Sequence, residues 1–309
     1  MLWWKKWFFK SYFEVKVTGI SLAFRLWKTP NFMLIRIGYE LIFDLKAPVA
    51  MSMLLDLVPD RAKDVRAYRS CVEPDVPVQR FSDSFGNVGS RLHAPAGKVR
   101  LWADGVVEDS GQPDPLALDA KQHPVEELPD ECLQFLLNSR YCEVDKLVPF
   151  AWDTFGHTPE GWARVQAICD WVNEKVTFGY AFARPTKSAT DVIIERLGVC
   201  RDFAHTALTL CRCMNIPARY ATGYLGDIGP DNPPTGAPMD FSGWFEVYLG
   251  GAWHTFDARH NKRLIGRIVM ARGRDATDCA LTTSYGPSPL VGFKVWTDEV
   301  TEDVLQEFN

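Results

Sequence analysis

The spacing of apolar residues changes along this chain of 309 residues, and the change limits the fold more than any other feature. From Ile35 to Phe43, apolar and polar residues alternate, which is typical of a half-buried strand. After Thr158, apolar residues recur every three or four positions, as on one side of a helix. Strand patterns return after Pro217, because proline cannot continue a helix. This order predicts an α+β fold.

Proline and turn residues divide the chain into parts. Short strands separated by turn sequences favour a β-sandwich at 33–110. We place a linker with a short helix at 111–157 and a second domain at 158–309. The predicted strands after the first are 76–81, 87–93, 99–107, 218–225, 244–249, 252–258, 268–272, 279–285 and 293–299, and helices are predicted to start near Asp130, Thr158, Ser188 and Cys200.

Residues 1–32 differ from the rest of the chain. They contain six Lys and Arg residues, one Glu and ten aromatic residues. Their apolar runs are too short for a secretory signal or a membrane span. We interpret this extension as a poorly ordered terminus; a second interpretation is that it lies on an anionic membrane surface. Regular patterning begins at Met33, so translation starts at either Met1 or Met33.

Composition excludes several classes of protein. A net charge of −5 argues against a nucleic-acid-binding role, which needs a basic face. With 47% hydrophobic residues, the chain is unlike a disordered protein. Its eight cysteines follow no regular disulfide framework, which predicts reduced thiols and a cytoplasmic location. We find no Walker A, GxGxxG, HExxH or CxxC motif, and therefore predict no cofactor and no metal.

Cys200 carries the main chemical signal. It opens a predicted helix directly after Gly198-Val199 and precedes Arg201. The free amides and the dipole of a helix N-terminus favour a thiolate, and a nearby cation adds to this effect. A thiolate in such a place can act as a nucleophile. The alternative is a small buried residue at a helix start.

Four blocks around Cys200 carry a family resemblance: GVCRDFAH at 198–205, NIPARY at 215–220, WFEVYL at 244–249 and WHTFD at 253–257. In this order they resemble the bacterial transglutaminase-like superfamily, from about Thr158 to Glu299. The resemblance implies a papain-like core, in which a helix bearing the cysteine packs on an antiparallel sheet. It also implies acyl transfer or amide hydrolysis through a thioester. The region 33–110 is similar to the β-sandwich that precedes this core in one bacterial subgroup, of the transglutaminase-like cysteine protease type.

The resemblance assigns two of the three catalytic positions. Cys200 matches the nucleophile, and Asp257 matches the acid that orients the base. The usual D-x-H-A-W segment of the family is written here as DFSGW at 240–244. Ser242 therefore stands where the catalytic histidine is expected, and the triad is incomplete.

Another histidine would have to replace it. A two-residue Gly250-Gly251 turn places His254 on the strand face opposite to Ser242 and Asp257. His260 lies beyond the strand, three residues after Asp257, where the chain can turn toward Cys200. His205 lies about 500° around the helix from Cys200 and therefore points to roughly the opposite side of the helix. We rank His260 first as the substitute base, a non-catalytic site second and His254 third.

These observations lead to two functional hypotheses. The first is a cysteine hydrolase of amide or peptide bonds, in which a backbone N–H at the helix start helps to hold the oxyanion. The second is a catalytically impaired pseudoenzyme that binds protein or peptide, because Ser242 replaces the histidine. Both predict a protein or peptide partner, and neither involves nucleic acid. The oligomeric state is not indicated.

Overall fold

The computed structural model describes residues 15–17, 20–22, 32–230, 232–233, 236 and 238–308. The chain forms two compact units, Met1–Phe32 and Met33–Asn309. In the first unit, strands β1 (Val15–Val17) and β2 (Ile20–Leu22) pair antiparallel. Most of the rest of the predicted poorly ordered extension lies outside the described residues.

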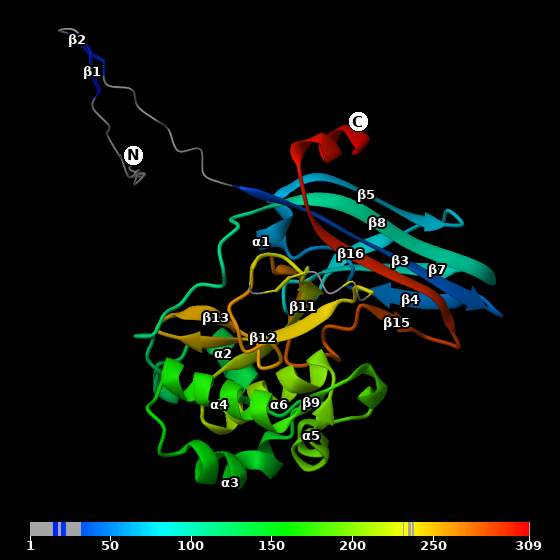
Figure 1. Cartoon of the computed structure of the whole chain (residues 1–309). Helices are drawn as coiled ribbons and strands as arrows, with labels where there is room; N and C mark the ends of the chain where they lie inside the picture. Colours follow the sequence, from blue (N-terminus) through cyan, green and yellow to red (C-terminus); the bar gives the residue numbers. More distant parts are fainter. Residues whose placement is uncertain are drawn as a thin grey trace, which may run out of the picture. The chain divides into compact units, whose positions relative to one another are not determined.

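Two antiparallel sheets of four strands form a sandwich in the second unit (Figure 1). One sheet has the order β16-β3-β8-β5 and the other the order β15-β4-β7-β6. Ile35 and Ile37 of one sheet and Met51 and Leu92 of the other are buried in the same core. The strands are β3 (Met33–Leu45), β4 (Val49–Met53), β5 (Val65–Glu73), β6 (Gln79–Ser82), β7 (Val88–Ala94), β8 (Gly97–Asp109), β15 (Thr282–Ser284) and β16 (Leu290–Val300).

The last two strands of the sandwich come from the end of the chain. β16 pairs with β3 along most of its length, and β15 pairs with β4. Both strands fall in the range 158–309 that we placed in the second domain, so the chain returns to the sandwich after building the α+β part. β4 and β5 were not predicted, because β4 is short and β5 mixes charged and apolar residues without a clean alternation.

A third antiparallel sheet, with the order β13-β12-β11-β14, lies between the sandwich and the main helices (Figure 1). Its strands are β11 (Ala218–Tyr224), β12 (Ser242–Leu249), β13 (Ala252–Phe256) and β14 (Ile268–Gly273). Gly250 and Gly251 join β12 to β13 with φ angles of 58° and 83°, which suit the tight turn that we predicted. The pairing of Leu249 with Ala252 is also as predicted.

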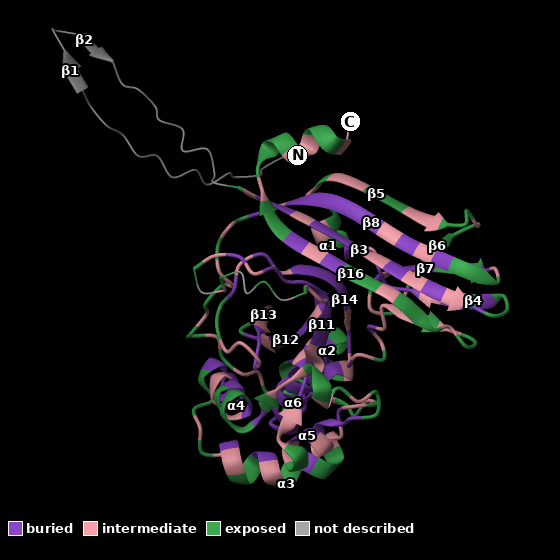
Figure 2. Ribbon diagram, turned by 45° about the vertical axis from the view of Figure 1, so that its right-hand side comes forward, coloured by how far each residue is buried: buried purple, intermediate pink, exposed green. Residues whose placement is uncertain are grey.

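Helix α6 occupies the centre of the helical layer. It packs on β11 and β12, and α3, α4 and α5 surround it on its other sides (Figure 1). All residues from Asp202 to Cys213 are buried, whereas α3 carries exposed residues on the outside (Figure 2). The helices are α1 (Pro59–Ala62), α2 (Asp130–Leu133), α3 (Val144–Phe155), α4 (Trp162–Lys175), α5 (Ala189–Glu195) and α6 (Cys200–Cys213); strands β9 (Thr177–Phe178) and β10 (Leu197–Gly198) and the 3-10 helices Val125–Glu127, Gln134–Leu136, Tyr180–Phe182 and Glu302–Phe308 complete the fold.

The helix starts agree with the sequence to different degrees. α6 begins at Cys200 as predicted, and Ser188 caps α5 in a capping box with Asp191. The start predicted at Thr158 is wrong: the Thr158 hydroxyl donates to the Phe155 carbonyl, and α4 begins only at Trp162. Gly161 precedes it with a φ of 82°, a conformation that an L side chain rarely adopts.

The predicted fold class is confirmed: an antiparallel β-sandwich accompanies an α+β core in which the cysteine-bearing helix packs on an antiparallel sheet. No helix in the described part of the chain is long and apolar enough to cross a bilayer.

Candidate active site

Cys200 is the first residue of α6 and follows the short parallel pair of β9 and β10. The carboxylate of Asp202 accepts a hydrogen bond from the Val199 N–H at 3.0 Å, which satisfies a free donor at the helix start. The Arg201 guanidinium donates to Asp202 Oδ1 and to the Arg184 carbonyl. Arg201 is thus engaged by these acceptors and is not the cation that stabilises the thiolate.

Cys200 is half-buried as a residue. Of the eight cysteines, Cys200 and Cys71 are half-buried, and the other six are buried. Burial raises the pKa of the Cys200 thiol; the Gly243 N–H and the charge of Arg259 act in the opposite direction, and Asp240 adds to the increase. The sequence led us to expect a stabilised thiolate, but the desolvation cost exceeds the effect of the helix start. At neutral pH the thiol of the free chain is therefore protonated.

Asp257 and His260 form a hydrogen-bonded couple just after β13. The His260 Nδ1 lies 2.8 Å from Asp257 Oδ2, and the backbone N–H groups of Arg259 and His260 donate to Asp257 Oδ1. Arg267 Nη2 donates to Asp257 Oδ2 at 3.1 Å. Burial alone would raise the pKa of the Asp257 carboxyl, but Arg267 and His260 hold it well below its usual range. An ionised Asp257 accepts a hydrogen bond best from a His260 tautomer that carries its proton on Nδ1.

The structure does not join this couple to the cysteine by a hydrogen bond. Among the described residues, no hydrogen bond connects the His260 ring with the Cys200 thiol. The His260 side chain is 22% exposed, so one side of the ring reaches the surface of the site.

The other positions singled out from the sequence lie as follows. Ser242 is the first residue of β12 and pairs with Gly223, and its carbonyl accepts from the Thr222 hydroxyl. His254 pairs with Val247, and its Nε2 contacts the Leu249 carbonyl at 3.1 Å, away from Asp257. His254 therefore has the orientation that the hairpin register predicts.

Sequence reasoning missed three side chains near the thiol. A Cβ atom at Gly243 would lie 2.3 Å from the Tyr220 hydroxyl, so this phenol fills the space beside the Gly243 N–H that faces Cys200. Tyr180, in the 3-10 helix after β9, is 57% exposed. The Arg259 guanidinium lies 3.9 Å from the centroid of the Phe178 ring. These residues come from separate elements, and only the folded chain brings them together.

His205 is a core residue, as its position on the helix predicts. It is 0% exposed; its ring stacks on Tyr141, and Nε2 accepts from the Ala276 N–H at 3.1 Å. Burial lowers the pKa of His205 from 6.5 to about 3. The imidazole is therefore neutral in the folded chain and takes no part in the chemistry at Cys200.

This buried histidine predicts a pH-dependent stability. Because the folded-state pKa is below the unfolded value, the unfolded chain takes up a proton first as pH falls below about 6.5. We expect the free energy of unfolding to decrease between pH 6.5 and 5, by up to about 1.4 kcal/mol per unit from this group. Urea unfolding across this range measures the slope. His205→Gln should flatten it; an equal slope in both proteins would contradict the assignment.

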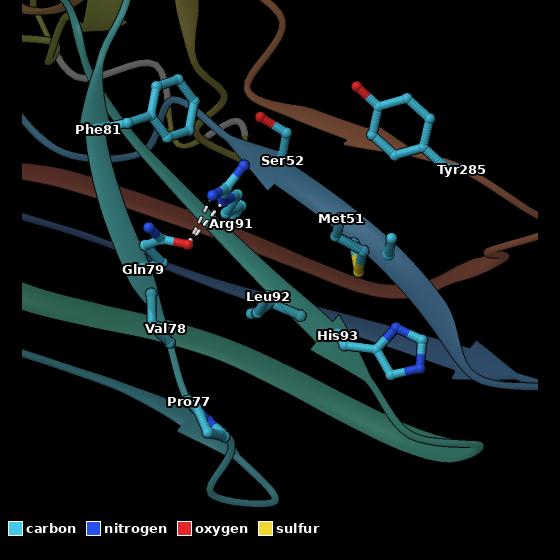
Figure 3. A pocket seen from close by; sticks show the side chains of 11 residues that line it. Met51, Ser52, Pro77, Val78, Gln79, Phe81, Arg91, Leu92, His93 and Tyr285 are labelled. Atoms are coloured by element: carbon cyan, nitrogen blue, oxygen red, sulfur yellow. Dashed lines mark hydrogen bonds between the residues drawn. The ribbon is translucent and has the colours of Figure 1, made fainter.

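Two cavities adjoin the candidate site. One, of about 280 Å³, is lined by Cys169, Asp257 and Asn261 among others. Another, of about 580 Å³, lies along Trp244, Glu246 and Arg267. A third groove, of about 670 Å³, lies in the sandwich and is lined by Phe81 and Tyr285 among others (Figure 3). In this groove, the Gln79 side-chain oxygen accepts hydrogen bonds from Arg91. In the described part of the chain, no group of three His, Cys, Asp or Glu side chains is arranged to hold a metal ion.

Comparisons with known proteins agree with this geometry. The family model described as the transglutaminase-like superfamily matches residues 152–258, which include Cys200, Ser242 and Asp257. A crystal structure described as "a Putative Cysteine Protease" from Cytophaga hutchinsonii is 31% identical, with a TM-score of 0.75, and the match covers 88% of this chain and 92% of that one.

Relatives also occur in mycobacteria. An uncharacterized protein of Mycobacterium leprae is 26% identical over 211 residues, which covers 65% of this chain and 73% of the relative. An uncharacterized protein of Mycobacterium tuberculosis is 27% identical over 234 residues, which covers 69% and 73%. Since the Cytophaga protein exceeds 30% identity over nearly its whole length, and the family model spans the cysteine helix and the hairpin, this chain belongs to the transglutaminase-like superfamily.

Proposed function

We propose that this chain is a cysteine hydrolase of amide or peptide bonds that acts through a thioester at Cys200. The observation that carries the proposal is a half-buried cysteine at the start of α6 combined with an ionised carboxylate that orients an imidazole, Asp257 with His260. The description of the Cytophaga relative as a cysteine protease candidate supports the same chemistry. The partner is a protein or peptide.

In the proposed reaction, His260 Nε2 takes the proton of the Cys200 thiol as the sulfur attacks the substrate carbonyl carbon. A backbone N–H at the start of α6 holds the oxygen that becomes negative. The protonated His260 then gives its proton to the leaving amine, and the C–N bond breaks to leave a thioester. Water, deprotonated by the same imidazole, releases the acid and restores the thiol. The raised pKa of the thiol makes this base necessary at neutral pH.

The proposal requires one movement. The His260 ring has to come within hydrogen-bond distance of Cys200 when substrate binds, with its contact to Asp257 Oδ2 kept. The partly exposed ring and its place after the end of β13 make this movement compatible with the fold.

A second candidate function is binding without catalysis. Ser242, where the family resemblance places a histidine, and the raised pKa of the Cys200 thiol favour it. In this case the chain is a pseudoenzyme that holds a protein or peptide over the same surface.

The substitution Ser242→His tests both candidate functions, the hydrolase and the pseudoenzyme. We expect the wild type to hydrolyse a mixture of unstructured peptides faster than a Cys200→Ala blank, measured as new amino termini. Ser242→His should increase the rate by up to about 10²-fold, because it supplies an imidazole at the usual position of the base. Ser242→Ala is the matched control and should not increase it. A wild-type rate equal to the blank, with activity only in Ser242→His, would overturn the hydrolase proposal and support the pseudoenzyme.

A further inference from the structure

Arg259 is held in place beside the cysteine by contacts at both its backbone and its side chain. Its N–H donates to Asp257 Oδ1 at 2.9 Å, and its carbonyl accepts from Asn173 at 2.7 Å. Its guanidinium carbon lies 3.9 Å from the centroid of the Phe178 ring. A cation–π contact at this distance limits the movement of the guanidinium.

The Phe178 ring connects this cation to the start of α6. Phe178 pairs with Gly198, two residues before Cys200, and its ring lies 6.3 Å from that of Phe203 in the first turn of the helix. The Tyr180 ring also contacts the Phe178 ring, and the two ring centroids are 5.3 Å apart. The guanidinium is therefore placed near the start of α6, where its charge acts on the Cys200 thiol.

The Arg259 guanidinium differs in its charge partners from other arginines of the chain. Among the residues that the structure describes, its guanidinium forms no ion pair with an Asp or Glu, whereas Arg184, Arg267 and Arg272 are each paired with two carboxylates. Asp240 is an acidic neighbour: burial raises the pKa of its carboxyl, and the Phe241 N–H and the charge of Arg259 act in the opposite direction. A pre-oriented and unpaired guanidinium beside a nucleophile is suited to a ligand anion.

We propose that Arg259, which packs over the Phe178 ring near Cys200, binds a carboxylate of the substrate next to the carbonyl group that Cys200 attacks. The inference rests on the proposed function, since it names the substrate class of the same site: peptides with an acidic side chain or a free carboxyl terminus close to the scissile amide. Asp240 repels this carboxylate and limits its affinity, and it disfavours substrates with several acidic groups.

Two alkylating reagents test the inference without knowledge of the natural substrate. Iodoacetate and iodoacetamide both transfer a CH₂ group to the thiolate sulfur with loss of iodide, but only iodoacetate carries a carboxylate. For each cysteine we compare the rate with iodoacetate to the rate with iodoacetamide. We expect this ratio to be about tenfold higher at Cys200 than at Cys71 in the same sample. Cys71 is also half-buried, but the Glu73 carboxylate 3.9 Å from its sulfur disfavours iodoacetate there, so the deciding comparison is the Cys200 rate ratio with and without the Arg259 charge.

The substitution Arg259→Gln should remove this preference. It should also slow both reagents at Cys200, because the charge of Arg259 favours the thiolate, so the ratio of the two rates is the readout. Arg259→Lys should keep part of the preference. The matched control Lys294→Gln removes one exposed positive charge and a contact with Trp296 in the sandwich, and should keep the preference whole. If Arg259→Gln does not fold, a fall in the iodoacetate-to-iodoacetamide ratio at Cys200 from the wild type to Arg259→Lys still decides.

The substrate carboxylate can belong to an acidic side chain or to a free carboxyl terminus. Two peptides that protect Cys200 from iodoacetamide to different extents distinguish these sources. One probe is an acetylated and amidated tripeptide with a central glutamate; the other is an acetylated trialanine with a free carboxyl terminus. Protection by one of them, lost in Arg259→Gln, identifies the source. Alkylation of Cys200 by both reagents without preference would overturn the carboxylate inference and leave the nucleophile intact. A Cys200 that reacts with neither reagent would overturn both proposals.

Discussion

Replacing Cys200 by alanine is expected to reduce hydrolysis of p-nitrophenyl acetate to the rate of the solution reaction, a loss of at least about 10³-fold. This ester is a small activated acyl donor, so its turnover needs the nucleophile but not the natural substrate contacts. The thiol is a small side chain at the first position of α6, where the helix is held by Asp202 and by a buried core. The variant should therefore unfold at the same temperature as the wild type.

The matched control is Cys71→Ala. Cys71 is the other half-buried cysteine, and it lies on β5 in the sandwich. The Cys71→Ala variant should keep the full rate of ester hydrolysis. Ester turnover that survives in Cys200→Ala but falls in Cys71→Ala, or falls equally in both, would mean that the reaction reports general thiol reactivity and not the proposed site.

Replacing His260 by glutamine is expected to lower the same rate by about 10²-fold at pH 7, within the usual range for a general base. The reason is the raised pKa of the Cys200 thiol: without a base, the thiolate is scarce at neutral pH. The loss should shrink at alkaline pH, because the thiol then ionises without help. Asp257 does not contribute to the acid limb in the neutral range, since its pKa is held well below its usual value.

His254→Gln is the control for this prediction. His254 contacts the Leu249 carbonyl and the Trp162 ring, away from Asp257. It should leave both the rate and its pH profile unchanged. A pH-independent loss in His260→Gln would indicate that the ring only supports the structure around Asp257, and a loss in His254→Gln alone would reverse our ranking of the two histidines.

Local signals in the sequence were sufficient for several parts of the site. Gly198-Val199 before Cys200 predicted the helix start, and Gly250-Gly251 predicted the register that separates His254 from Asp257. These features depend on residues that are neighbours in the chain. The short spacing of Asp257 and His260 likewise allowed their contact to be anticipated, and the structure places the His260 Nδ1 within hydrogen-bond distance of the Asp257 carboxylate.

Long-range contacts could not be read in the same way. Arg201 is adjacent to Cys200 in sequence, yet Asp202 and the Arg184 carbonyl engage it, and Arg259 from the end of the hairpin takes its place near the thiol. The burial that raises the thiol pKa depends on packing that no local pattern records. The return of β16 to pair with β3 across the chain is of the same kind.

Site-resolved acylation of the wild-type chain tests the central claim most directly. The full chain is mixed with p-nitrophenyl acetate at pH 7, quenched in acid after short times, digested and analysed by mass spectrometry. The account predicts that one acetyl group appears first on Cys200, well before Cys71, and that its appearance slows in His260→Gln. Equal acetylation of Cys200 and Cys71, unchanged in His260→Gln, would contradict a nucleophilic role for Cys200.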